Sequence, residues 1–291
     1  MNISLYDIAT TGNIKWGTFA LAGLVERYMV IDFHAHIYPE KIAGKAVSNI
    51  GEFYKIPVQC EGTVRDLLAR GEAGGIGAFV VFSAAAVPAQ VGSINNFIAG
   101  VCDGQKGKGI ALTGFGTLHP GMENPGEEIE RMRGLGLKGV KFHPDMQQFD
   151  IDDERMMKIY ALLEGKFPVI FHTGDYRYGY SHPARLAGVL DAFPKLKVVA
   201  AHFGGWSLFD LALEYLKDRH CYFDVSSSIP FLGKRRTEEL IGIYGAERIL
   251  FGSDYPMWDP AGCLKTFGEL NLRDRERDMI LRENAERLLC V

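Results

Sequence analysis

Short apolar runs alternate with longer amphipathic stretches along most of the chain. Eight runs rich in Val, Ile and Phe predict buried strands, because strands covered on both faces are nearly continuous in apolar residues. Seven stretches with helical spacing predict helices. The predicted strands are 30–35, 77–82, 109–117, 138–142, 168–172, 197–202, 221–226 and 248–252, and the predicted helices are 63–71, 125–136, 152–165, 183–193, 206–218, 235–245 and 275–289.

The alternation of strand and helix indicates the fold class. Strands that are joined by helices through short Gly, Pro and Asp turns form right-handed βαβ units with parallel strands. Eight such units close into a barrel, and barrels of this kind often have about 250 residues. We therefore expect a single α/β domain over residues 29–291, a (β/α)8 TIM barrel with its active site at the carboxyl ends of the strands. Residues 1–28 form an N-terminal extension to which the sequence assigns no role.

Composition and charge exclude several classes of function. The chain has a net charge of −4 and no basic run, so nucleic acid is not an expected partner. No segment approaches the roughly 18 apolar residues of a membrane span, and the N-terminus lacks the pattern of a signal peptide. The five scattered cysteines show no ligand spacing, which is typical of reduced thiols. These features predict a cytoplasmic protein that acts on a small molecule.

Polar side chains end several of the predicted strands, and they supply the candidate chemistry. His34 and His36 end the first strand in "VIDFHAH", His172 ends the fifth in "VIFHTG", His202 ends the sixth in "VVAAHFGG", and Asp254 follows the eighth in "ILFGSD". Residues two apart in a strand share a face, so the first two imidazoles should point into the barrel together. Imidazole and carboxylate groups that converge in this way are typical of a metal site with an open position for water.

A structural role is the alternative for each of these residues. One histidine at a strand end commonly hydrogen-bonds a backbone carbonyl and binds no metal. The combination of two alternate histidines with later His, His and Asp residues at strand ends favours the metal interpretation. For His119 and His143, which both precede Pro, a loop-fixing role is favoured. For Asp32, beneath the two histidines, we favour support of a ligand or capping of a turn.

With these residues in place, the sequence resembles the amidohydrolase superfamily. The motifs "DFHAH", "GVKFHP", "PVIFHTG", "AHFGG" and "ILFGSDYP" carry the resemblance from about residue 29 to the end. It is greatest to the amidohydrolase 2 branch, which contains aminocarboxymuconate-semialdehyde decarboxylase. The resemblance implies one divalent metal ion, most often Zn²⁺ with Mn²⁺ as the alternative. It assigns the ligands to His34, His36, His172 and Asp254, and the catalytic role to His202.

The fourth strand departs from the pattern of the two-metal relatives. These relatives bridge two metal ions with a carboxylated lysine or a glutamate at this position, and the chain has Lys141 with no Glu nearby. Lys141 leaves a second metal ion open, although the residue could equally pair with a substrate carboxylate. We favour one metal ion. The missing Glu and the missing basic patch argue against a nuclease of this superfamily.

The expected site supports two reactions. In the first, metal-activated water hydrolyses a small, carboxylated or cyclic amide, lactone or ester, while Asp254 takes the proton and His202 stabilises the developing oxyanion. In the alternative, the same site decarboxylates an unsaturated or aromatic carboxylic acid. A barrel that binds metal or ligand without turnover is the third possibility. The presence of both His202 and Asp254 argues against it.

A few residues near the strand ends are candidates for substrate contact. They are Lys141, Arg177, Trp206 and Trp258. Aromatic and cationic side chains over a metal site suit a planar or carboxylated small molecule. Arg177 is equally well explained as a solvated surface charge, and the two tryptophans as a cover for the top of the barrel. The resemblance also implies a homodimer as a possible assembly.

Overall fold

The computed structural model describes residues 29–290, so the predicted N-terminal extension at 1–28 lies outside the described residues. Within that range, eight parallel strands form one sheet in the order β1 to β8. The strands are β1 (Val30–His36), β2 (Ile76–Phe82), β3 (Ala111–Gly116), β4 (Gly139–Phe142), β5 (Val169–Phe171), β6 (Val198–Ala200), β7 (Tyr222–Asp224) and β8 (Ile249–Leu250). Backbone bonds from Phe33 N to Phe251 O (2.8 Å) and from Asp254 N to His34 O (2.8 Å) close the ring between β8 and β1. The predicted barrel is confirmed.

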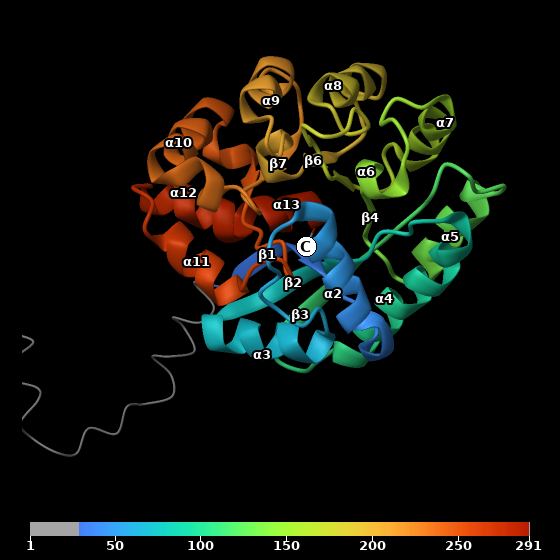
Figure 1. Cartoon of the computed structure of the whole chain (residues 1–291), viewed down its shortest axis with the longest axis horizontal. Helices are drawn as coiled ribbons and strands as arrows, with labels where there is room; N and C mark the ends of the chain where they lie inside the picture. Colours follow the sequence, from blue (N-terminus) through green and yellow to red (C-terminus); the bar gives the residue numbers. More distant parts are fainter. Residues whose placement is uncertain (1–28, 291) are drawn as a thin grey trace, which may run out of the picture.

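Helices surround the strands in a ring (Figure 1). They are α2 (Glu40–Tyr54), α3 (Val64–Gly74), α4 (Val91–Gln105), α5 (Pro125–Gly134), α6 (Pro144–Gln147), α7 (Glu154–Leu163), α8 (Pro183–Ala192), α9 (Phe209–Leu216), α10 (Ile229–Tyr244), α11 (Pro260–Gly268), α12 (Asp274–Asp278) and α13 (Asn284–Leu289). The sequence pattern missed α2, α4, α6 and α11. The expected closing helix at 275–289 is interrupted by a π-helical turn over Met279–Glu283. No helix of the described chain is long and apolar enough to cross a membrane.

The interior of the barrel is apolar at one end and polar at the other. Side chains from the strands, among them Ile31, Val80 and Phe115, form one buried cluster. Ala285 and Leu288 of α13 pack into the same cluster, so this last helix closes the amino-terminal end of the barrel. Figure 1 shows α13 near the middle of the ring. The carboxyl ends of the strands are therefore left for the polar site.

The first strand departs from simple alternation. Its register with β2 shifts between Asp32 and Ala35, because three steps along β1 match two steps along β2. Phe33 joins the apolar cluster inside the barrel. His34 follows it directly and still reaches the same interior, where its ring lies 5.1 Å from the ring of Phe82. The irregularity thus lets two consecutive side chains enter the barrel.

Asn284 ties α13 to the end of the barrel. It is fully buried, and its Nδ2 donates to Ala246 O (2.7 Å) and Ile249 O (2.6 Å). We expect Asn284→Leu to lower the free energy of unfolding by about 2–4 kcal/mol, because two buried carbonyls lose their donor. Urea unfolding measures this, with the exposed Asn271→Ala as the control. A change within about 0.5 kcal/mol, the usual range for surface substitutions, would contradict the assigned role.

Candidate metal centre

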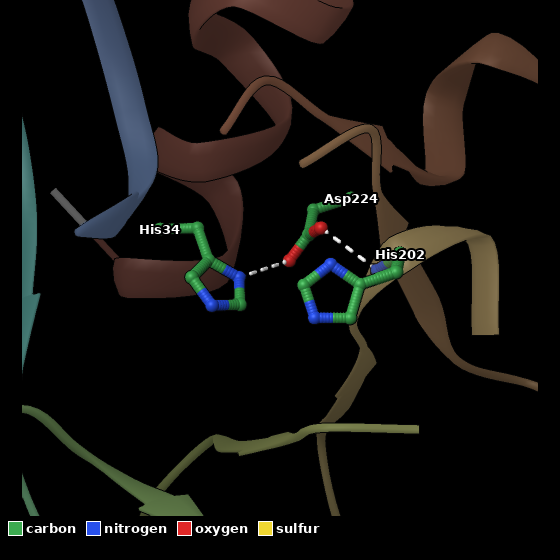
Figure 2. Close-up of side chains that lie close together, drawn as sticks. All are labelled: His34, His202 and Asp224. Atoms are coloured by element: carbon green, nitrogen blue, oxygen red, sulfur yellow. Dashed lines mark hydrogen bonds and ion pairs between the residues drawn. The ribbon is translucent and has the colours of Figure 1, made fainter. Parts of the chain in front are cut away.

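His34 is held by a carboxylate that sequence reasoning missed. Asp224, the last residue of β7, accepts from His34 Nδ1 at 2.8 Å, and both side chains are fully buried. The other oxygen of Asp224 accepts from the backbone N of His202 at 3.0 Å, so one carboxylate links three strand ends (Figure 2). With its proton on Nδ1, His34 presents the lone pair of Nε2 to the barrel mouth.

His36 and Asp254 lie on the Nε2 side of His34. Asp254 Oδ1 lies 3.3 Å from His34 Nε2 and 3.6 Å from His36 Nε2. The ligand atoms of these three residues all lie within 4.8 Å of one another. Asp254 Oδ2 points away from them and accepts from Ser227 Oγ at 2.5 Å, and Ser227 Oγ accepts in turn from Trp258 Nε1 at 2.8 Å. The carboxylate is thus oriented with one oxygen toward the imidazoles.

The hydrogen bonds of His202 determine which of its nitrogens carries the proton. Its Nδ1 faces Ser226 O and Ser226 Oγ, both at 2.9 Å. Ser226 Oγ gives its only proton to Asp224, so both groups are acceptors and Nδ1 is the protonated nitrogen. Burial lowers the pKa of His202 to about 3, which keeps the ring neutral. Nε2 therefore carries a lone pair, which can accept one hydrogen bond. Stabilising an oxyanion, the role predicted for His202, needs a donor at Nε2, whereas the proton lies on Nδ1.

His172 continues the same network. Its Nδ1 lies 3.1 Å from His202 Nε2 and donates to that lone pair. Its Nε2 is buried and meets no hydrogen-bond partner within residues 29–290, with the nearest carboxylate oxygen of Asp145 at 3.6 Å. The ring stacks on His143 at 4.1 Å. His172 lines the same pocket as His36 and Asp254, although its ligand atoms fall outside the cluster formed by His34, His36 and Asp254.

Three residues assigned a structural role hold the backbone around the site. Asp32 Oδ1 accepts from the backbone N of His34 and of Ser253, both at 3.0 Å, and it thereby joins β1 to the loop after β8. His143 Nδ1 accepts from Met146 N at 3.3 Å. His119 Nδ1 accepts from Gly121 N at 3.0 Å. These contacts agree with turn-capping and loop-fixing roles.

Three residues of the site have strained backbone conformations. His202, Ser227 and Asp254 have φ values of 58°, 48° and 64°, in the left-handed region that side chains other than glycine seldom adopt. Such conformations persist where the surrounding structure enforces them, and they are often found at functional sites. The three residues share the network around Asp224 and Asp254, so the strain sets the directions of the candidate catalytic groups.

The residues present fit a divalent metal ion. His34 Nε2 and Asp254 Oδ1 lie 3.3 Å apart with Lys141 Nζ beside them, and the buried Nε2 of His172 has its lone pair unused. Burial lowers the pKa of His34, His36 and His172, so all three are neutral, the form that binds metals. This donor set of imidazoles and one carboxylate suits Zn²⁺ or Mn²⁺.

Lys141 lies in the middle of the site. It is fully buried, and its Nζ is 3.2 Å from His34 Nε2. It also lies 5.1 Å from the centre of the Phe82 ring. Burial lowers the pKa of Lys141, while the carboxylates of Asp224 and Asp254 oppose the change. The amine is thus close enough to assist a bound metal ion or to meet a substrate carboxylate.

Aromatic side chains wall the pocket above these groups. Trp206 and Trp258 line it together with His172, His202 and Asp254. Tyr54 of α2 also lines it, and its hydroxyl lies 2.7 Å from His143 Nε2. The sequence pattern did not reveal Tyr54, because α2 itself was missed. The space beside His36 and His172 measures about 50 Å³, and the space beneath the tryptophans about 10 Å³.

Arg177 forms an ion pair with Asp175 and packs against aromatic rings of α2. Its guanidinium pairs with both oxygens of the buried Asp175, at 2.6 and 2.9 Å. It also lies 4.8 Å from the centre of the Phe53 ring and 5.4 Å from that of Tyr54, both on α2. The side chain is 22% exposed, so it is not the solvated surface charge considered from the sequence. Arg177 joins α2 to the loop after β5, and its donors are engaged there.

We expect Arg177→Leu to lower the free energy of unfolding by about 3 kcal/mol, because it leaves the buried carboxylate of Asp175 unpaired. Replacing both partners by leucine should recover most of that loss, because the double variant buries no lone charge. Urea unfolding of the two variants makes the comparison. If the double variant is less stable than the single one, the ion pair does not act as described.

Comparisons with solved structures give the same architecture. The chain is 17% identical to 2,6-dihydroxybenzoate decarboxylase from Rhizobium (TM-score 0.69), with 90% of this chain and 99% of the other covered. It is 17% identical to a dihydroxybenzoic acid decarboxylase from Polaromonas sp. JS666 with bound manganese (TM-score 0.70; 90% and 97% covered). It is also 17% identical to a probable 2-pyrone-4,6-dicarboxylic acid hydrolase from Acinetobacter baumannii (TM-score 0.66; 90% and 100% covered). At this level of identity, the comparisons establish the fold.

The sequence itself identifies the family. A family model described as amidohydrolase, Amidohydro_2, matches residues 31–290, which is almost the whole described chain. The match contains β2 to β8, all of β1 except Val30, and every residue of the candidate metal centre. It confirms the resemblance inferred from the strand-end motifs. The chain therefore belongs to the amidohydrolase family.

Proposed function

We propose that the protein is a metal-dependent hydrolase of a small amide, lactone or ester, cyclic or carboxylated. The family and its neighbours include both hydrolases and decarboxylases, so the reaction has to be argued from the site. The observation that carries the proposal is the setting of Asp254. One of its oxygens faces two imidazoles, and the other is held by a serine hydroxyl. A carboxylate placed in this way can bind the metal ion and also accept a proton from water.

His34, His36, His172 and Asp254 would hold the metal ion. When bound, a divalent ion supplies Lewis acidity toward a carbonyl and lowers the pKa of water from 15.7 to about 7. We propose Zn²⁺ or Mn²⁺, and the manganese bound in the Polaromonas relative supports the second. Lys141 stands next to His34 and is available to a substrate carboxylate or to a second metal ion.

Ser227, Asp254 and His202 have separate roles in the proposed reaction. Ser227 keeps Asp254 turned toward the reacting centre through the 2.5 Å hydrogen bond. Asp254 takes the proton of the attacking water. General base catalysis of this kind contributes roughly 10²–10⁴-fold to rate. His202 is neutral and accepts from His172 Nδ1 at Nε2, so we assign it the role of directing the lone pair of His172 Nε2 toward the metal ion. Tyr54, Trp206 and Trp258 restrict access of bulk water.

Decarboxylation is the second candidate, and two observations favour it. The pocket walls are largely aromatic, which suits a flat unsaturated acid. The Rhizobium and Polaromonas structures, which share the fold, are decarboxylases of dihydroxybenzoic acids. In this reaction the bond between the substrate carbon and its carboxylate breaks, CO₂ leaves, and the carbon takes a proton. Lys141 would bind the substrate carboxylate before the reaction.

A substrate screen distinguishes the reactions. Zinc- and manganese-loaded protein is incubated with lactones, amides, esters and unsaturated carboxylic acids, and both hydrolysis and CO₂ release are followed. We expect hydrolysis that is lost in His202→Asn and retained in His220→Asn, which changes a histidine outside the site. CO₂ release from an acid without any hydrolysis would replace the first proposal by the second. Bound metal without turnover of any compound would favour a binding protein.

A further inference from the structure

A second cavity lies behind the wall of the metal centre. It measures about 260 Å³ and is bounded by the residues that follow β7 and β8, by the start of α10 and by α11. Ser227 and Trp258 line this cavity and also the pocket above His172 and Asp254. Gly252 lines it as well and lies directly against the centre, because a Cβ added there would come within 2.8 Å of His34 Cβ. The cavity and the metal centre therefore share one wall.

The volumes decide where a substrate can fit. The spaces next to the candidate ligands measure about 50 and about 10 Å³. An engineered protein cavity of about 150 Å³ binds benzene. The spaces at the metal centre are smaller than this, whereas the second cavity is larger. The second cavity therefore offers room for a ring that the spaces beside the candidate ligands do not.

The lining of the second cavity indicates the chemistry of its occupant. Val225, Ile229 and Phe251 give it an apolar interior. Of the described residues that line it, none is Lys, Arg or His, and the carboxylate of Asp259 is occupied by Arg70 at 3.1 Å and by the backbone of α11. An anionic group would find no partner there. An apolar ring or branched alkyl group would find a large contact area.

We propose that this cavity binds the apolar group of the substrate, next to a carbonyl that reacts at Asp254. The inference rests on the proposed hydrolase function for the position of the carbonyl, and it narrows the substrate to an amide, ester or lactone with an aromatic or bulky alkyl substituent. Trp258 stands in the shared wall, where its Nε1 donates to Ser227 Oγ and its ring lies 6.2 Å from that of Phe231. Because Trp258 lines both spaces, a substrate that occupies them contacts its ring.

The test fills the cavity from the side remote from the metal centre. Thr266 of α11 lines the cavity and is exposed, so Thr266→Phe adds a ring there, while Lys265→Phe adds the same ring one residue away, outside the lining. Binding of 4-bromobenzohydroxamate and of acetohydroxamate to zinc-loaded protein is measured by calorimetry. We expect Thr266→Phe to reduce the ratio of the two affinities at least tenfold, and Lys265→Phe to leave it unchanged. An unchanged ratio in Thr266→Phe would overturn the proposal.

A second measurement separates this inference from the metal proposal. Crystals of the metal-free protein are soaked with bromobenzene, and the anomalous signal locates the bromine. We expect it between Val225, Phe251 and Cys263 in the wild type and absent in Thr266→Phe. If neither hydroxamate binds, the metal proposal fails, and the bromine position alone decides whether the cavity is an apolar ligand site. Bromine found elsewhere, or in both proteins equally, counts against the cavity.

Discussion

Asp254→Asn should abolish activity and most of the metal binding. The amide keeps the shape of the side chain but removes the negative charge that faces His34 Nε2 at 3.3 Å and His36 Nε2 at 3.6 Å. It also removes the group proposed to take the proton from water. We expect kcat/KM to fall by about 10³-fold or more, because a ligand and a general base are lost together. Steady-state kinetics at saturating metal, combined with metal titration, measures both effects.

The matched control for this variant is Asp210→Asn. Asp210 is 89% exposed and pairs with Arg236 on the surface, so its replacement should leave both quantities unchanged. Circular dichroism of the two variants checks that each keeps the fold. A folded Asp254→Asn protein that binds metal and turns over substrate at the wild-type rate would exclude Asp254 from the centre.

Asp224→Asn should weaken metal binding although Asp224 is not a proposed ligand. Its carboxylate accepts the proton of His34 Nδ1, and it accepts from His202 N and Ser226 N on the other side. If the new amide nitrogen faces His34, the proton of the imidazole moves to Nε2 and the ligand lone pair is lost. If it faces His202 and Ser226, its N–H groups meet the backbone N–H groups of these two residues, which then lack an acceptor. Either orientation damages the site, and we expect metal affinity to fall by about 10–100-fold.

A double-variant cycle isolates this indirect effect. In the His34→Ala background, Asp224→Asn has no imidazole to orient, so its further effect on metal affinity should be small. Competition with a fluorescent chelator measures the four affinities. Equal losses from Asp224→Asn with and without His34 would show that Asp224 acts on the centre by another route.

The strands were predictable because burial determines their composition. Each of the eight apolar runs overlaps a strand: β1 and β2 extend one residue beyond their runs, and the other six strands are shorter than predicted, most of all β8 (Ile249–Leu250). Helices α2 and α4 escaped detection for a physical reason. Gly44 and Gly51 interrupt the first, and Gly92, Gly100 and Gly104 interrupt the second, so their helical propensity is low. Packing against the barrel stabilises them, and this is not visible in a local pattern.

The residues of the candidate site that end strands were predictable from the sequence. Parallel strands bring their carboxyl ends to one rim, so histidines and aspartates that end strands could be grouped from sequence alone. Asp224 also ends a strand, in "YFDVSSS", and this position was the available signal. Its role depends on a contact with His34 across 190 residues, which no local pattern specifies. The tautomer of His202 likewise depends on Ser226, a neighbour set by the fold.

The metal content of the purified protein tests the central claim most directly. The full chain is produced with zinc and manganese in the medium, and bound metal is determined by inductively coupled plasma mass spectrometry. We expect about one equivalent of divalent metal in the wild type, because His36, His172 and Asp254 line one pocket and His34 Nε2 lies 3.3 Å from Asp254 Oδ1. His34→Ala and Asp254→Asn should lose most of it, and Asp210→Asn should retain it. Less than half an equivalent in the wild type, unchanged by His34→Ala, would contradict the account.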